Sequence, residues 1–107
     1  MGVLPPEEGV ALLAKSFRAL GDPTRLRLLE FLLTEEHSVT ECVRHVGIAQ
    51  SRVSTHLSQL ADSGYVRVRR AGQFAYYRVA DHRVADTVKL ARAIAADNAT
   101  ALIAAMR

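Results

Sequence analysis

A run of hydrogen-bonding side chains between positions 50 and 59 carries the residue types that read DNA. Arginine and glutamine match the donors and acceptors on base edges, and hydroxyl groups and arginine also bind phosphates. We therefore predict a DNA contact here, provided that one helix face presents these side chains together. The candidates are Gln50, Ser51, Arg52, Ser54, Thr55, Ser58 and Gln59.

A second cationic segment follows within a few residues, and its candidates for DNA binding are Arg67, Arg69, Arg70 and Gln73. Residues 47–80 contain five arginines against one aspartate, whereas the whole chain of 107 residues carries a net charge of +3. Positive charge gathered in one stretch is the footprint of a surface that faces phosphates. A merely solvated basic face is the alternative, and charge alone does not exclude it.

Cys42 is the only cysteine, so the chain can form neither an internal disulfide nor a Cys-x-x-Cys metal site. A metal site would therefore have to combine ligands from different parts of the sequence. The candidates for a nitrogen and oxygen site for nickel, cobalt or zinc, if a dimer brings them together, are His37, Cys42, His45, Asp81, His82 and Asp86. The alternative is that the histidines are ordinary surface residues and that Cys42 is a small core residue.

No pattern in the sequence predicts an enzyme. There is no nucleophile beside a base and no glycine loop for phosphates. His56 borders the polar stretch, and we expect it to pack rather than to contact DNA. The chain has no apolar run of about 20 residues and no signal-peptide pattern, so we expect a soluble cytoplasmic protein without a membrane partner.

In the first part of the chain, the elements that must position these residues are predicted to be helices. Apolar residues at three- and four-residue spacing predict a helix over about 6–20. Asp22 and Pro23 then begin a second helix, with Leu26 facing inward and Arg25 outward. Residues 38–41 form a Ser-x-x-Glu capping box that opens a third helix ending at Gly47, and a fourth runs from 50 to about 62.

A hairpin and a last helix complete the chain. The β-rich runs 65–70 and 74–80 are joined by a short turn, and a long helix follows over about 81–105. The order is typical of a mainly α fold with a small β-hairpin wing, the winged helix-turn-helix, as one domain over 1–107. The wide apolar stripe of the last helix predicts a homodimer whose interface is built by helices 6–20 and 81–105.

Two segments carry a resemblance to a known family. Residues 19–27, ALGDPTRLR, and residues 51–81, SRVSTHLSQLADSGYVRVRRAGQFAYYRVAD, resemble the ArsR/SmtB family of metal-responsive repressors. The resemblance implies a dimer built from the first and last helices, binding of double-stranded operator DNA that represses transcription, and release when an inducer binds.

The metal sites of that family are not matched in full. In its arsenic-sensing Cys-Val-Cys pattern, Arg44 stands where the second thiolate belongs. In its zinc site on the last helix, Asp81 matches and Asp97 is a candidate match, but Arg83 and Ile94 replace the histidines. The resemblance still implies a repressor released by an inducer, with a transition metal such as nickel as a candidate. The alternative is a regulator that depends on an accessory protein to sense its signal.

Overall fold

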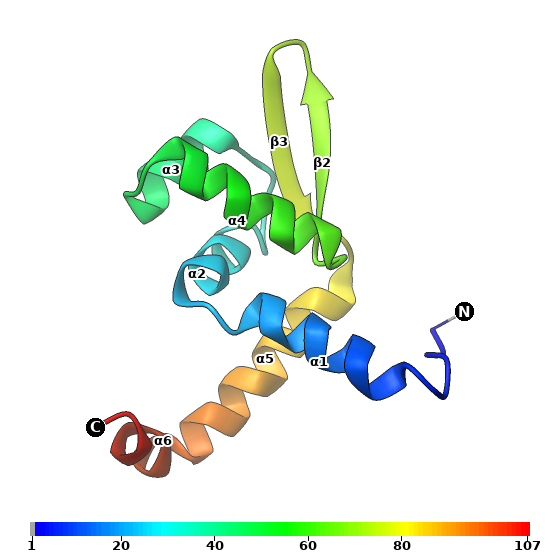
Figure 1. Cartoon of the computed structure of the whole chain (residues 1–107). Helices are drawn as coiled ribbons and strands as arrows, with labels where there is room; N and C mark the ends of the chain where they lie inside the picture. Colours follow the sequence, from blue (N-terminus) through cyan, green and yellow to red (C-terminus); the bar gives the residue numbers. More distant parts are fainter. Residues whose placement is uncertain (1) are drawn as a thin grey trace.

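The computed structural model describes residues 2–107 as a helical body from which a β-hairpin projects (Figure 1). The helices and strands, in chain order, are α1 (Gly9–Leu20), α2 (Pro23–Phe31), β1 (His37–Ser38), α3 (Val39–Val46), α4 (Gln50–Asp62), β2 (Val66–Ala71), β3 (Phe74–Val79), α5 (His82–Asp97) and α6 (Ala99–Ala105). This is the predicted winged helix-turn-helix: α3 and α4 form the helix-turn-helix, and β2 and β3 form the wing.

Local capping explains where α2 and α3 begin. The Asp22 carboxylate accepts a hydrogen bond of 2.9 Å from the backbone N–H of Arg25, and Pro23 occupies the first position of α2. The capping box is complete: the Ser38 hydroxyl accepts from the Glu41 N–H, and the Glu41 carboxylate accepts from the Ser38 N–H. At the end of α3, Gly47 takes a φ of 70°, which favours glycine. Each of these features was predicted.

One hydrophobic core joins the helix-turn-helix to the wing and to the start of α5. Leucines of α2 and α4 are its largest fully buried side chains. The wing contributes one residue from each strand, and α5 contributes residues only from its first half. The core consists of Leu28, Leu29, Leu32, Cys42, Val53, Leu57, Leu60, Val66, Tyr77, Val84 and Val88. Packing of the buried face of α4 against this core therefore holds the helix in place.

The wing is part of a three-stranded antiparallel sheet in the order β1-β3-β2. Its two long strands meet at a tight turn, in which Gly72 has a φ of 61°. The short strand β1 pairs His37 with Tyr77 and Ser38 with Tyr76. This pairing ties the base of the wing to the start of α3.

The structure corrects several expectations about the elements. The first helix begins at Gly9 rather than near residue 6, and the last one breaks at Asn98, whose side-chain amide donates to the Ile94 carbonyl at 2.8 Å. The chain then continues as α6 in a new direction (Figure 1). On α2 the Leu26 side chain is exposed, whereas Arg25 is half-buried, the reverse of the prediction. The strand β1 was not predicted.

A large apolar face on α1, α5 and α6 has no cover within the protomer. Every residue from 89 onward is exposed, although Arg92 of α5 forms an ion pair with Glu30 of α2. The C-terminal part of α5 extends away from the wing (Figure 1). Between α1, α2 and α5 lies an apolar hollow of about 490 Å³. A small protein rarely leaves such a face in water, so the face indicates a partner. Its exposed apolar residues are Val10, Leu13, Phe17, Leu90, Ile94, Leu102, Ile103 and Met106.

No helix within residues 2–107 combines the length and the apolar character that crossing a bilayer requires.

Candidate DNA-binding surface

Helix α4 presents a polar face to solvent while its other face lies in the core. Val53, Leu57 and Leu60 are fully buried, and the side chains between them point outward. Arg52 is exposed and has no hydrogen-bond or ion-pair partner among the residues described. The Thr55 hydroxyl donates to the Ser51 carbonyl at 3.0 Å, so its oxygen remains free to accept. The exposed polar residues of this face are Gln50, Ser51, Arg52, Thr55, Ser58 and Gln59.

A polar groove separates the N-terminal ends of α3 and α4 from the tip of the wing. It holds about 360 Å³ and brings together residues from three elements that are far apart in the sequence. Gln50 and the half-buried Ser54 line it from α4, and Gln73 lines it from the turn of the wing. Predicted site residues from the helix and from the wing thus meet along one groove.

The two faces of the wing carry different arginines. Because side chains alternate along a strand, Arg67 and Arg69 share one face and Arg70 lies on the other. Arg67 stands directly opposite Arg78 of β3. Two like charges opposite each other are unfavourable unless an anion lies nearby. The Glu36 carboxylate is close enough for the charge of Arg78, after that of Arg69, to contribute to the lowering of its pKa.

Arg69 is already engaged within the protomer. Its guanidinium donates to the Glu36 carboxylate at 2.7 Å and 3.1 Å, and its Cζ lies 4.6 Å from the centre of the Tyr76 ring. The hydrogen bond from Arg69 lowers the pKa of Glu36. Arg69 therefore braces the wing against the segment before β1. The cations of this region without a carboxylate partner in residues 2–107 are Arg52, Arg67, Arg70 and Arg78.

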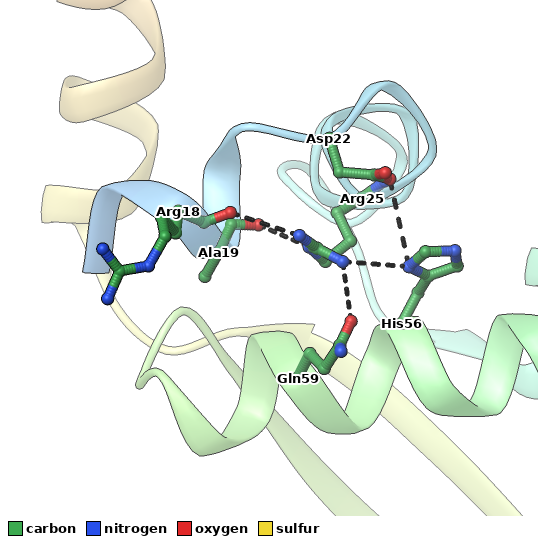
Figure 2. Close-up of polar contacts among 6 residues, drawn as sticks. All are labelled: Arg18, Ala19, Asp22, Arg25, His56 and Gln59. Atoms are coloured by element: carbon green, nitrogen blue, oxygen red, sulfur yellow. Dashed lines mark hydrogen bonds and ion pairs between the residues drawn. The ribbon is translucent and has the colours of Figure 1, made fainter. Parts of the chain in front are cut away.

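Gln59 and His56, on the edge of the α4 face, are engaged by α2. The Gln59 side-chain oxygen accepts a hydrogen bond of 2.6 Å from Arg25, and His56 Nδ1 lies 3.3 Å from the same guanidinium nitrogen (Figure 2). His56 therefore packs against α2, as predicted. Gln59 is exposed but committed to an internal contact, which the sequence analysis did not foresee.

The histidines and the cysteine near α3 do not converge. His37 and His45 stack on Phe31, with ring centroids 3.7 Å and 4.0 Å from that of Phe31. His37 instead faces two carboxylates, those of Glu35 and Glu41, each at 3.5 Å. Cys42 lies in the core with no exposed surface, as the core interpretation predicted, and burial raises the pKa of its thiol to about 11.

The other metal candidates lie at the start of α5. Asp81 caps this helix by accepting from the Arg83 N–H at 2.8 Å and also binds the Arg83 side chain at 2.9 Å, which together hold its pKa at about 2. Within residues 2–107, no group of three or more histidine, cysteine or acidic side chains is arranged to hold a metal ion. One protomer therefore does not assemble His37, Cys42 and His45 with Asp81, His82 and Asp86. A site shared across a dimer stays a prediction.

Sequence reasoning missed the contacts that connect α1 to the DNA-binding half. The Tyr65 hydroxyl, just after α4, contacts the Ser16 hydroxyl at 2.6 Å, and Arg25 contacts both α1 and α4. A polar or charged residue beside an apolar helix stripe is the only local signal for such contacts. That signal does not name the partner: the Tyr65 contact spans 49 positions and the Gln59 contact of Arg25 spans 34, whereas the Ala19 contact of Arg25 spans six.

Comparison with known proteins agrees with this geometry. The model of the arsR family of bacterial regulatory proteins matches residues 22–68. A Streptomyces lividans protein named a probable mercury resistance operon repressor is 61% identical over 89 residues, which make up 83% of this chain and 71% of that protein. The family model covers the helix-turn-helix and the first residues of the wing.

Two solved structures show the same fold. The crystal structure of Rv0081 from Mycobacterium tuberculosis has a TM-score of 0.79 and 30% identity, and covers 94% of this chain and 99% of that one. A homodimeric winged helix-turn-helix DNA-binding domain from Mycobacterium bovis, solved by NMR, has a TM-score of 0.77 and 28% identity, with 92% of each chain covered. These relatives are regulators of transcription rather than enzymes. The chain described here accordingly belongs to the ArsR family of winged helix-turn-helix transcriptional repressors.

Proposed function

We propose that a homodimer of this chain binds a near-palindromic operator by placing its two α4 helices in successive major grooves, about 10 base pairs apart. The observation that carries this proposal is the exposed polar face of α4, which continues across the groove of Gln50, Ser54 and Gln73 to the wing. Transcription is repressed while the dimer occupies the operator.

The residues of this surface take different roles in the proposal. Arg52 and Gln50 have the donors and acceptors to read base edges in the major groove of the DNA. The hydroxyl groups of α4 bind phosphates or bases of that same major groove; they belong to Ser51, Ser54, Thr55 and Ser58. Arg67, Arg70 and Gln73 bind the backbone beside it. Arg69 and Gln59 support the surface more than they contact DNA, because Glu36 and Arg25 already hold them.

Removing the one free cation of the α4 face tests the proposal. Arg52→Ala is expected to weaken operator binding by about tenfold, since an arginine contact to a base or phosphate is typically worth about 1–3 kcal/mol. If Arg52 contacts a phosphate, the slope of log affinity against log salt also falls by about one. Fluorescence anisotropy on a duplex selected from a random library, measured at several salt concentrations, gives both values.

Arg107→Ala serves as the matched control, because it removes the same charge from the far end of the chain, beyond α6. The control is expected to bind as the unsubstituted protein does. Equal losses of operator affinity in both variants would mean that only the net charge of the protein matters. An unchanged affinity in Arg52→Ala would count against α4 as the helix that binds DNA.

The proposed release signal is an inducer, and the name of the Streptomyces lividans relative makes mercuric ion the first one to consider. Soft metal ions prefer thiolate sulfur. Cys42 is the only cysteine; it is fully buried, and the pKa of its thiol is about 11, so the folded protomer presents no thiolate. The residues of one protomer do not fit a mercuric ion, and we propose no step that passes through it.

A second candidate follows from the same observation: the repressor receives its signal through an accessory protein. If this candidate holds, mercuric, nickel, cobalt and zinc ions are expected to leave the operator affinity of the folded dimer within about threefold, because sensing then lies in the accessory protein. The observation that favours it is that residues 2–107 of one protomer hold no group of three ligands. Calorimetry with each ion, alongside anisotropy with and without it, measures both binding and release.

Cys42→Ala shows which residues are responsible if a metal ion does release the DNA. Release of DNA by mercuric ion that disappears in this variant would assign the sensing to Cys42 and contradict the accessory-protein candidate. Tight binding of nickel, cobalt or zinc that survives in the variant and releases DNA would instead point to a histidine and carboxylate site built by the dimer.

A further inference from the structure

The side chain of Arg25 lies at the junction of three helices. Figure 2 shows its guanidinium between the C-terminal end of α1 and the flank of α4. Nε donates to the Ala19 carbonyl at 2.7 Å, and one terminal nitrogen donates to the Arg18 carbonyl at 3.2 Å. The last carbonyls of a helix lack partners within it and carry a partial negative charge, so a cation is well placed there.

The other edge of the guanidinium reaches α4. Its second terminal nitrogen donates to the Gln59 side-chain oxygen at 2.6 Å and lies 3.3 Å from His56 Nδ1. Asp22 completes the cluster: its carboxylate accepts from the Arg25 N–H at 2.9 Å and lies 3.9 Å from His56 Nδ1. A single side chain of α2 thus contacts α1, six and seven positions before it in the sequence, and α4, 31 and 34 positions after it.

Only a guanidinium serves this arrangement. Its donors point in fixed directions within one plane, so it can bind carbonyls on one side and a side-chain oxygen on another at the same time. A lysine ammonium is a compact charge on a flexible stem and cannot span both sides in a fixed geometry. The contacts therefore fix an angle as well as a distance between α1 and α4.

The two helices that Arg25 connects have different tasks. α1 carries Val10, Leu13 and Phe17 on the uncovered apolar face, and α4 carries the polar face proposed to bind DNA. In a dimer, the orientation of α4 relative to the interface decides how far apart the two α4 helices lie. That separation must match successive major grooves, about 10 base pairs apart.

We propose that Arg25 is a positioning residue that holds α4 at a fixed orientation relative to the dimerisation helix α1, and so sets the spacing of the two DNA-binding helices. Arg25 acts through α4 and does not touch DNA. The inference rests on the proposed DNA-binding function, but its structural part is measurable without DNA.

Arg25→Met tests the proposal, because it keeps an unbranched apolar stem and removes the guanidinium with all of its donors. The core residues remain, as does the contact of Tyr65 with Ser16 between α1 and the end of α4, so we expect a folded dimer. Operator affinity is expected to fall by about tenfold, a typical coupling between two sites. The slope of log affinity against log salt is expected to stay unchanged, because no phosphate contact is lost.

The separation of the α4 helices is measured directly by electron paramagnetic resonance. A spin label on Ser51→Cys, at the exposed end of α4 away from Arg25, reports the distance between protomers, and the buried Cys42 is shielded from labelling. We expect one narrow distance distribution without DNA, and a broad one once Arg25→Met is added. Arg25→Lys is expected to restore the charge without restoring the narrow distribution.

Two further variants complete the test. Gln59→Met removes one of the two contacts of Arg25 to α4 and leaves the one to His56, so it is expected to broaden the distribution less. It answers the question if Arg25→Met does not fold. Arg27 is an exposed arginine on the same helix, so Arg27→Met is the matched control. It should change neither the operator affinity nor the distance distribution.

An unchanged distance distribution in Arg25→Met and Gln59→Met would overturn the proposal. A salt slope reduced by about one in Arg25→Met would overturn it too, because Arg25 would then be a phosphate contact. If the unsubstituted dimer binds no duplex from the library, the proposed function fails, while the distance measurement still decides the role of Arg25.

Discussion

Replacing Ile94 with glutamate is expected to split the dimer and, with it, operator binding. Ile94 is 65% exposed in the protomer and lies in the part of α5 that contributes nothing to the protomer core. In a dimer built on α1 and α5, a glutamate at this position puts an unpaired carboxylate into an apolar interface from each protomer, which costs several kcal/mol. We expect the dimer dissociation constant to rise by at least about 100-fold.

The loss of DNA affinity should be of similar size. Two linked protomers gain about 10²–10⁴ in affinity by binding two half-sites at once, and a monomer forfeits that gain. Sedimentation velocity gives the oligomeric state, and anisotropy on the same samples gives the affinity. The helical content, measured by circular dichroism, is expected to be retained, because Ile94 lies outside the protomer core.

Ala96→Glu is the matched control. It adds the same charge to α5 two positions further on, which places the side chain about 200° around the helix from Ile94. A dimer is expected to survive this change. Persistence of the dimer in Ile94→Glu would move the interface away from α5 and leave its exposed apolar residues without an explanation.

The parts of this fold that local signals determine were predicted from the sequence. The capping box of Ser38 and Glu41 and the glycine at the end of α3 act within a few residues, so their effect can be read from neighbouring positions. The same holds for the buried and exposed sides of α4, which follow from the helical period around Val53 and Leu57. The polar face of α4 was predicted for that reason.

Features that depend on distant partners were not predicted. The two residues of β1 become a strand only because Tyr76 and Tyr77 of the wing offer them hydrogen bonds. The inward turn of Arg25 likewise depends on carbonyls of α1 and on Gln59 of α4. The break at Asn98 was missed because its apolar neighbours continue the helical pattern across it.

The same distinction separates the candidate DNA-binding residues. Exposure of Arg52 follows from its place on the helix, and the sequence analysis named it correctly as an outward residue. The engagement of Arg69 depends on Glu36, which is 33 positions away. A list of basic residues therefore overstates how many cations are free, and the structure is needed to find those without a partner.

Replacing Leu57 with alanine is expected to lower the free energy of unfolding by about 3 kcal/mol, within the range for a leucine truncated in a packed core. Leu57 has no exposed surface and lies beneath the polar face of α4, against the other leucines of the core. A small domain has only about 5–15 kcal/mol of stability in total, so this is a large share. Urea denaturation followed by circular dichroism, at one fixed protein concentration, measures the change.

Ser58→Ala provides the matched control, since it is the next residue and is exposed. Its effect on stability is expected to stay within about 0.5 kcal/mol. An equal loss in the two variants would mean that α4 is not seated on the core as described. The operator affinity of Leu57→Ala, measured where this variant is fully folded, shows whether polar contacts alone orient α4 or whether the packing beneath it is also required. If affinity is retained, polar contacts such as those of Arg25 suffice to orient the helix; if it falls, the packing beneath α4 orients it as well.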